Sequence, residues 1–184
     1  MNILATKWLK QVPLSVGYYL SGFVDGEGSF NVSLRRRNDH TLGWQIVLTF
    51  NVSQKDKTVL EILKKHLGCG RLQKRKLDGV WYFVVSNPQA LSERVIPFFN
   101  QFGFLSTTKK RNFSIFKQIV EMVITNQHCS AEGTRKIIEL RETLNEGRGR
   151  KRKFSLSDYQ KYLSDNPQRL YVRIHPRAKR VNKI

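Results

Sequence analysis

Apolar residues recur with two different spacings along the chain, and the places where the spacing changes divide it into elements. Residues 18–27 form an apolar helical pattern that runs into two acids, Asp25 and Glu27, separated by a glycine. Apolar and polar residues then alternate from Ser29 to Arg37 and again over residues 45–52. A spacing of two is typical of half-buried strands, so the two runs predict a long hairpin.

Helical spacing returns after residue 53, with Ser53 as the expected N-cap and Gly68 as the stop. A second strand pair is expected around the turn Asp78-Gly79, because Asp-Gly strongly favours a hairpin turn. The remaining pattern predicts a helix that begins at Asn87-Pro88 and is interrupted or kinked at Pro97, followed by helices over residues 107–126, 130–145 and 157–163.

The predicted order is therefore helix, two strands, helix, two strands and helices. This order defines an α+β fold of the type αββαββα, with additional C-terminal helices. The chain of 184 residues is expected to contain an N-terminal extension over 1–14, one domain over 15–146 and a basic C-terminal extension over 147–184.

The net charge restricts the kinds of partner that the protein is expected to bind. The formal net charge is +19 and the sequence pI is about 10.3, which predicts binding to a polyanion. Residues 29–87 contribute +7 and residues 148–184 contribute +10, whereas residues 1–28 are neutral. The first helix is therefore expected to pack against protein, and the extension to contact phosphates without reading sequence.

The two cysteines, Cys69 and Cys129, are sixty positions apart in a chain with four histidines. We therefore expect neither a disulfide framework nor a zinc site. We expect the protein to occupy a reducing intracellular compartment. No apolar run reaches the roughly 18–20 residues of a membrane span, and the N-terminus has no signal-peptide pattern.

One face of the predicted strands carries side chains that can read bases. Arginine pairs with guanine, and asparagine or glutamine with adenine, in the major groove. That face has almost no acidic side chains, whereas a sheet face that is only exposed to solvent usually mixes basic, acidic and neutral polar residues. The expected base-reading residues are Asn31, Ser33, Arg35, Arg37, Gln45, Asn51, Arg71, Gln73 and Arg75, with Arg36, Lys74 and Lys76 on phosphates.

The negative charges of Asp25 and Glu27 at the end of the first helix require a positively charged partner. Carboxylates at a helix C-terminus oppose the helix dipole, and a divalent cation used on a phosphate backbone is the natural partner in so basic a chain. Gly22 and Gly26 lie four positions apart, on one helix face, and would let a partner helix approach closely.

Residues 20–28, LSGFVDGEG, resemble the signature of the LAGLIDADG homing endonucleases. Ser21 stands where the family often has alanine, and Gly26 and Glu27 stand where the motif's name has alanine and aspartate. The resemblance covers roughly residues 15–145 and implies a curved, saddle-shaped antiparallel sheet that straddles double-stranded DNA. Members with a single motif act as homodimers, so one motif implies a two-fold dimer with Gly22 and Gly26 in its interface.

The same resemblance implies the site residues. Glu27 matches the second acid of the motif and is the expected ligand of Mg²⁺, for which Mn²⁺ is a possible substitute. Gln54 matches a polar position that organises water at the scissile phosphate. A basic residue before Phe113 completes such sites; Lys109 is the expected one, with Lys110 and Arg111 as alternatives.

The resemblance thus implies a homing endonuclease that cleaves both strands of a long pseudo-palindromic DNA site by metal-dependent phosphodiester hydrolysis. Relatives of this kind occur in organelles and archaea, so either setting is expected. A catalytically silent binder, such as an intron RNA maturase or a DNA-binding regulator, is the alternative. A basic RNA-binding structural protein would explain the charge but not the motif.

Overall fold

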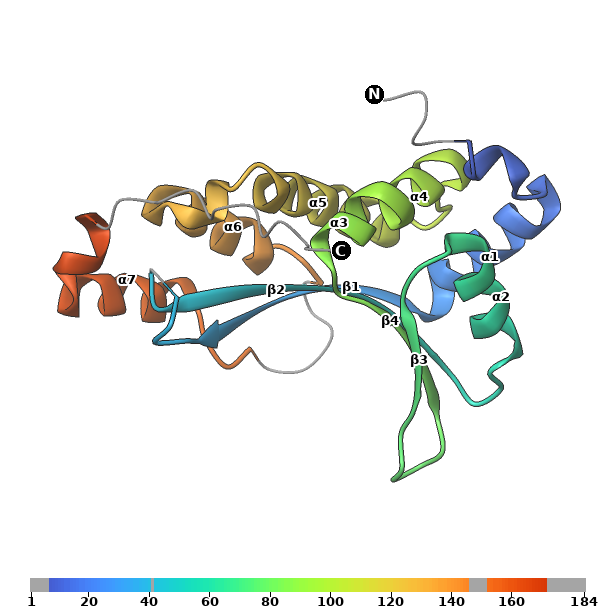
Figure 1. The fold of residues 1–184 in the computed structure, drawn as a ribbon, viewed down its shortest axis with the longest axis horizontal. Helices are drawn as coiled ribbons and strands as arrows, with labels where there is room; N and C mark the ends of the chain where they lie inside the picture. Colours follow the sequence, from blue (N-terminus) through green and yellow to red (C-terminus); the bar gives the residue numbers. More distant parts are fainter. Residues whose placement is uncertain (1–6, 41, 146–151, 172–184) are drawn as a thin grey trace, which may run out of the picture.

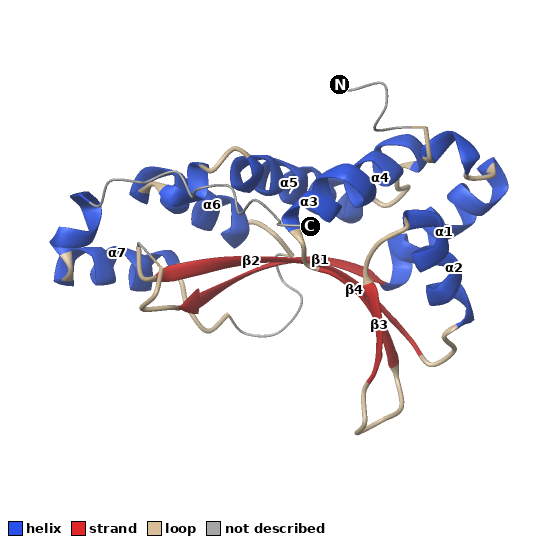
Figure 2. Cartoon of the chain, viewed as in Figure 1, coloured by secondary structure: helices blue, strands red, loops and turns tan. Residues whose placement is uncertain are grey.

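A four-stranded antiparallel sheet, with helices on one of its faces, forms the framework of the molecule (Figures 1 and 2). The computed structural model describes residues 7–40, 42–145 and 152–171. The strands are β1 (Gly28–Arg36), β2 (Trp44–Gln54), β3 (Arg71–Lys74) and β4 (Trp81–Val85), in the spatial order β1-β2-β4-β3. Parts of the expected extensions, residues 1–6, 147–151 and 172–184, lie outside the described residues.

The helices follow the predicted order. They are α1 (Leu14–Glu27), α2 (Thr58–Leu67), α3 (Pro88–Ala90), α4 (Ile96–Phe102), α5 (Thr107–Ile124), α6 (Ala131–Glu142) and α7 (Leu156–Asp165), with a π-helical turn at Leu91–Val95 and 3-10 turns at Leu9–Gln11, Gln127–Cys129 and Pro167–Tyr171. The predicted α+β fold with a four-stranded antiparallel sheet is confirmed.

The predicted start of α2 is wrong. Ser53 does not cap the helix, because β2 continues to Gln54 and Ser53 pairs with Tyr82 of β4. The helix begins at Thr58, whose N–H donates to the Asp56 carboxylate over 2.9 Å. It ends as expected at Gly68, which has a left-handed φ of 65°.

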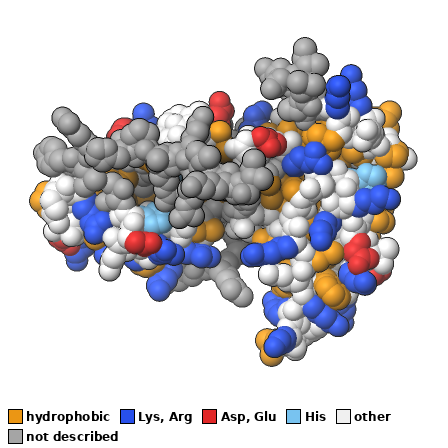
Figure 3. All heavy atoms as spheres, viewed as in Figure 1, with side chains coloured by type: hydrophobic (Ala, Val, Ile, Leu, Met, Phe, Trp, Pro, Cys, Tyr) orange, Lys and Arg blue, Asp and Glu red, His pale blue; other side chains and the backbone are white. Residues whose placement is uncertain are grey.

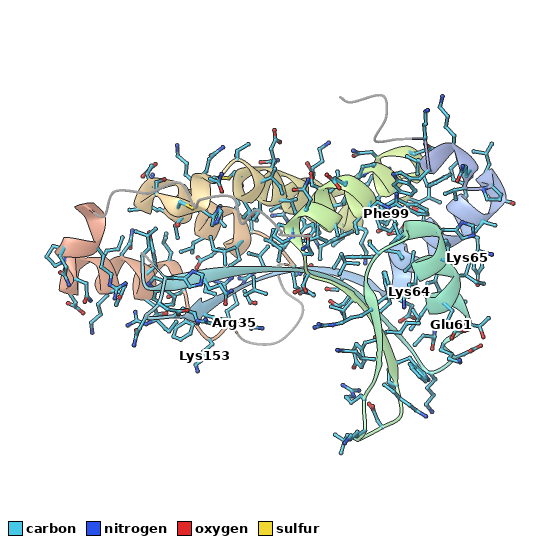
Figure 4. All side chains as sticks on the ribbon, viewed as in Figure 1. Arg35, Glu61, Lys64, Lys65, Phe99 and Lys153 are labelled. Atoms are coloured by element: carbon cyan, nitrogen blue, oxygen red, sulfur yellow. The ribbon has the colours of Figure 1, made fainter. Side chains whose placement is uncertain are left out.

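An aromatic cluster joins the sheet to the helices. Phe30 and Phe50 are cross-strand partners on the helix-covered face, and their ring centroids lie 5.2 Å apart. The ring of Phe116 of α5 lies 5.1 Å from that of Phe30, and the ring of Phe99 of α4 lies 5.5 Å from that of Phe50. Phe99 is labelled in Figure 4. The period-two pattern therefore places these rings where they are fully buried.

The helix after β4 changes type at the proline. The Asn87 side chain caps its start by accepting the Ala90 N–H over 3.0 Å, as predicted. The π-helical turn Leu91–Val95 ends two residues before Pro97, which has no N–H and whose ring would clash with a carbonyl one turn back. A wider turn at this point accommodates the ring and lets the chain continue as α4.

The end of α1 is bonded to the start of α5. The Asp25 carboxylate accepts the N–H groups of Leu105 and Ser106 over 3.0 and 2.9 Å, and also the Ser106 hydroxyl. One turn earlier, the buried Ser21 hydroxyl donates to the Gly103 carbonyl. Burial raises the pKa of Asp25, but the bonds from Ser106 and Leu105 and the charge of Lys109 outweigh it, so the net pKa is lowered.

Replacing Asp25 with asparagine should reduce the free energy of unfolding by about 1 kcal/mol at pH 7, because asparagine keeps an acceptor but loses the negative charge at the positive end of α5. Because the folded pKa lies below the ordinary 3.8, the contribution is fully present above that value and is lost as the pH falls through the lowered pKa. The difference between the two proteins should therefore shrink below about pH 4 in denaturant titrations.

The control is Asp165→Asn, at the exposed end of α7, which should change stability by less than about 0.5 kcal/mol. If the free energies of unfolding of the wild-type and Asp25→Asn proteins differ by the same amount at pH 7 and pH 3, this account is contradicted.

Candidate active site

Glu27 is the last residue of α1, and its side chain is exposed. The chain passes directly into β1, because Gly28 is both the residue that caps the helix and the first residue of the strand. Since Asp25 is engaged by the first turn of α5, Glu27 is the carboxylate of this motif that faces solvent.

Lys109 lies beside this junction. It belongs to the first turn of α5, and its Nζ donates to the Gly28 carbonyl. Burial lowers the pKa of Lys109, and the negative charges of Asp25 and Glu27 only partly oppose that shift. Lys110, the alternative considered from the sequence, is exposed. The structure therefore brings Lys109 to the acidic motif.

Gln54 lies at the same end of the sheet. The register pairs Gly28 with Val52, so Gln54 is two residues beyond the start of β1 along the neighbouring strand. Its Oε1 accepts the N–H of Lys55 over 2.8 Å, and the side chain is half-buried. Three chain segments, at residues 27, 54 and 109, are thus arranged around one end of the β1–β2 pair.

Glu27 is the solvent-facing carboxylate of this site that could bind a metal ion. The described part of the chain contains no group of three or more His, Cys, Asp and Glu side chains placed to hold a metal. Mg²⁺ usually keeps several waters and binds one or two carboxylates together with phosphate oxygens. A single solvent-facing carboxylate, Glu27, fits that mode and does not fit a closed all-protein metal site.

The helix-free face of the sheet carries the predicted base-reading residues. Arg35 and Gln45 are cross-strand partners there, and Arg71 and Gln73 lie on the same face of β3. Figure 3 shows Lys and Arg side chains along this side and over the β3–β4 hairpin, with fewer acidic ones among them. The remaining members on this face are Asn31, Ser33 and Asn51.

Two of these residues are bonded to each other. Asn31 Nδ2 donates to Asn51 Oδ1 over 2.8 Å and to Ser29 Oγ over 3.0 Å, so the three side chains form a connected polar strip. Such a strip holds the amide groups in fixed orientations.

The arginines near the hairpin turns are held by turn aspartates. Arg37 forms a two-point ion pair with Asp39, with distances of 2.8 and 2.7 Å, and Arg75 is paired in the same way with Asp78. The Arg36 guanidinium lies over the Trp44 and Tyr162 rings, and its expected phosphate contact stays a prediction.

The outer face of α1 is apolar and exposed. Gly22 and Gly26 are both exposed there, and a Cβ added at either would meet no atom within 4 Å. Tyr18 and Tyr19 are 59% and 57% exposed one turn earlier. Large exposed apolar side chains next to two glycines are typical of a protein interface.

Sequence reasoning missed two of the side chains that bind the free edge of β1, those of Asn145 and Arg141. Its carbonyls at Gly28, Phe30 and Val32 accept hydrogen bonds from Lys109, Asn145 and Arg141 respectively. Asn112 completes the arrangement by bonding to Asn145 over 2.9 and 3.1 Å. An asparagine inside the apolar stripe of α5 was the available signal, because a buried amide requires partners.

No helix in the described ranges is long and apolar enough to cross a membrane.

Known proteins share this sequence and fold. A family model described as LAGLIDADG endonuclease matches residues 20–120. The probable intron-encoded endonuclease 2 of Neurospora crassa is 31% identical over 132 residues, which are 70% of this chain and 29% of that protein. The homing endonuclease I-ApeII of Aeropyrum pernix is 32% identical over 103 residues, 55% of this chain and 60% of that protein.

Among solved structures, the archaeal intron-encoded homing endonuclease I-Vdi141I complexed with DNA superposes with a TM-score of 0.75 at 29% identity, over 82% of this chain and 95% of that one. The chain spans less than a third of the length of the Neurospora relative. Since the family model covers more than half of the chain and the fold agrees, this chain belongs to the LAGLIDADG endonuclease family.

Proposed function

We propose that this protein is a site-specific homing endonuclease that acts as a homodimer and hydrolyses one phosphodiester bond in each strand of a DNA duplex. The observation that carries the proposal is the position of Glu27, Gln54 and Lys109 at one end of a sheet whose helix-free face bears the side chains expected to read bases. Antiparallel strands fit the major groove, so the sheet positions the duplex and its end presents the reactive groups.

Two copies are needed for two cuts. One chain offers a single solvent-facing motif carboxylate, and a two-fold dimer would present one to each strand. The exposed face of α1 supports that arrangement, because Gly22 and Gly26 permit close approach while Tyr18 and Tyr19 supply apolar area. Contact along α1 would bring the two Glu27 side chains toward a common axis.

Glu27 would hold Mg²⁺ together with phosphate oxygens of the DNA. When bound, the ion polarises the phosphate and lowers the pKa of an attacking water. Lys109 acts beside it: its ammonium is partly shielded from water, so its charge stabilises negative charge on the phosphate, and its lowered pKa also suits it to proton transfer. Gln54 orients the attacking water through its amide.

Replacing Glu27 with glutamine should reduce cleavage at least about 100-fold and leave DNA binding intact or tighter, because the shape is kept and a charge that repels phosphate is removed. Cleavage of supercoiled and linear target with Mg²⁺, and binding in EDTA, measure the two effects separately. Glu61→Gln, at an exposed position of α2, is the matched control and should cut normally. Near-normal cleavage by the Glu27 variant would refute the assignment.

Lys109→Ala should lower single-turnover cleavage about 100-fold, the usual contribution of one positioned acid–base or charged group. Lys110→Ala should change it less than about threefold, since an exposed side chain contributes at most a phosphate contact. Measuring both at saturating protein removes differences in binding. The opposite ranking would assign the role to Lys110.

Gly22→Leu should convert the dimer into a folded monomer without cleavage activity. The monomer should remain folded, because the new side chain meets no protein atom within 4 Å of its Cβ position in one chain. Sedimentation equilibrium gives the mass and circular dichroism checks the fold. Gln118→Leu, at an exposed position of α5, is the control and should remain dimeric. An unmutated protein that cuts as a monomer would disprove the dimer.

A further inference from the structure

The outer half of the β1–β2 hairpin has little sheet support. β4 pairs with β2 only over residues 50–54, so residues 44–49 of β2 have β1 as their single described neighbour in the sheet. A two-stranded ribbon is only marginally stable in water unless something packs against it. The direction of this ribbon must therefore be set by what covers it.

A second, smaller core covers the ribbon. It is separate from the main core and consists of Leu34 and Trp44 of the hairpin, Ile138 of α6, and Tyr159 and Tyr162 of α7. The Trp44 ring makes edge contacts with Tyr159 and Tyr162 at centroid distances of 6.2 and 5.8 Å. Phe154, just before α7, lies 5.0 Å from the same ring.

The C-terminal residues also contact the hairpin turn itself. The Arg36 guanidinium lies 3.7 Å from the centroid of the Tyr162 ring, and the same ring packs directly against Gly43, whose φ is 71°. Arg169 donates to the His40 carbonyl over 2.8 Å. Both sides of the turn are thus contacted by residues that follow α6.

These C-terminal residues are anchored to the body of the protein. Arg141 of α6 donates to the Val32 carbonyl over 2.9 Å and to the Phe154 carbonyl over 2.8 Å, which links β1, α6 and the following segment. Arg152 donates to the Arg141 carbonyl over 2.9 Å, and the Tyr159 hydroxyl donates to the Ala131 carbonyl over 3.0 Å. We call residues 152–169 the C-terminal clamp.

Predicted base-reading residues lie on the opposite face of the same ribbon. Arg35 and Gln45 are cross-strand partners next to Arg36 and Trp44, which the clamp contacts. Arg35 is seven residues from Gly28, which corresponds to about 24 Å of strand, or roughly seven base pairs from the reactive end.

We propose that the C-terminal clamp determines specificity for the outermost base pairs of each half-site by fixing the direction of the β1–β2 hairpin tip. The inference rests on the proposed function, because it assumes that the helix-free face reads DNA. It assigns Tyr162 and Trp44 as positioning residues that act through Arg35, Arg37 and Gln45. It also differs from the expectation that residues 148–184 serve only phosphate contacts.

The first measurement needs no DNA. In Tyr162→Ala, hydrogen exchange should become at least tenfold faster at the Arg37 and Gly43 amides, which bond across the turn, and stay unchanged at the Arg75 amide of the other hairpin. Tyr162→Phe keeps the ring and should behave as wild type, as should Lys161→Ala on the exposed side of α7. Equal acceleration at both hairpins, or none at the first, would overturn the proposal.

The second measurement selects binding sites from a randomised duplex library in EDTA, where no cleavage is needed. In Tyr162→Ala, the preference for the selected base should fall about tenfold at the outermost base pairs and stay unchanged at the inner ones. A tenfold fall is about what the loss of one base-reading contact produces. Leu63→Ala, in the main core, controls for general loss of stability and should not alter the ranking by position.

Loss of preference that is uniform across the site, or outer preferences equal to wild type, would refute the clamp. A wild-type protein that selects a site in this assay but never cuts it would refute the proposed hydrolysis. The effect of Tyr162→Ala on the preferences at the outermost base pairs would still test the clamp. The two failures are therefore distinguishable.

Discussion

The bond between the last turn of α1 and the first turn of α5 is the constraint on which the site depends. A helix that ends in two acids is unfavourable, because its C-terminus already carries partial negative charge. The negative charge of Asp25, one of the two acids, is compensated because its carboxylate accepts N–H groups at the positive end of α5. The same contact places Lys109 one turn into α5, where its amine reaches the Gly28 carbonyl. Glu27 then remains exposed to solvent, with the Lys109 ammonium close enough to interact with its charge.

The free edge of β1 explains how the rest of the sheet keeps its place against the helices. An exposed edge invites pairing with other chains, and proteins usually cover or block it. Here three alternate carbonyls, at Gly28, Phe30 and Val32, accept side-chain donors from α5, from the segment after α6, and from α6. Long-range hydrogen bonds of this kind fix register as well as position, so the first half of β1 is held against the helices by one set of contacts.

Periodicity predicted the elements well because each one buries a single face. The strand residues Phe30 and Phe50 could be assigned from spacing alone, and Gly68 from its position after a helical stripe. Ser53 could not, since a serine suits an N-cap and an extended strand equally, and only pairing with Tyr82 decides between them. The polar contacts of Asn145 and Arg141 join residues more than a hundred positions from their partners, and no local pattern encodes such contacts.

The basic composition shows why total charge overstates contact with nucleic acid. Arg36 lies between aromatic rings, Arg94 donates to the Leu67 carbonyl at the end of α2 while lying over Trp8, and Arg152 donates to carbonyls at the end of α6. A guanidinium suits these places because it combines a flat apolar face with several donors at its rim. Such residues raise the net charge to +19 but are engaged in building the fold. The salt dependence of the proposed DNA binding should therefore follow the number of phosphates that the sheet and its two hairpins contact, and should be well below what the net charge suggests.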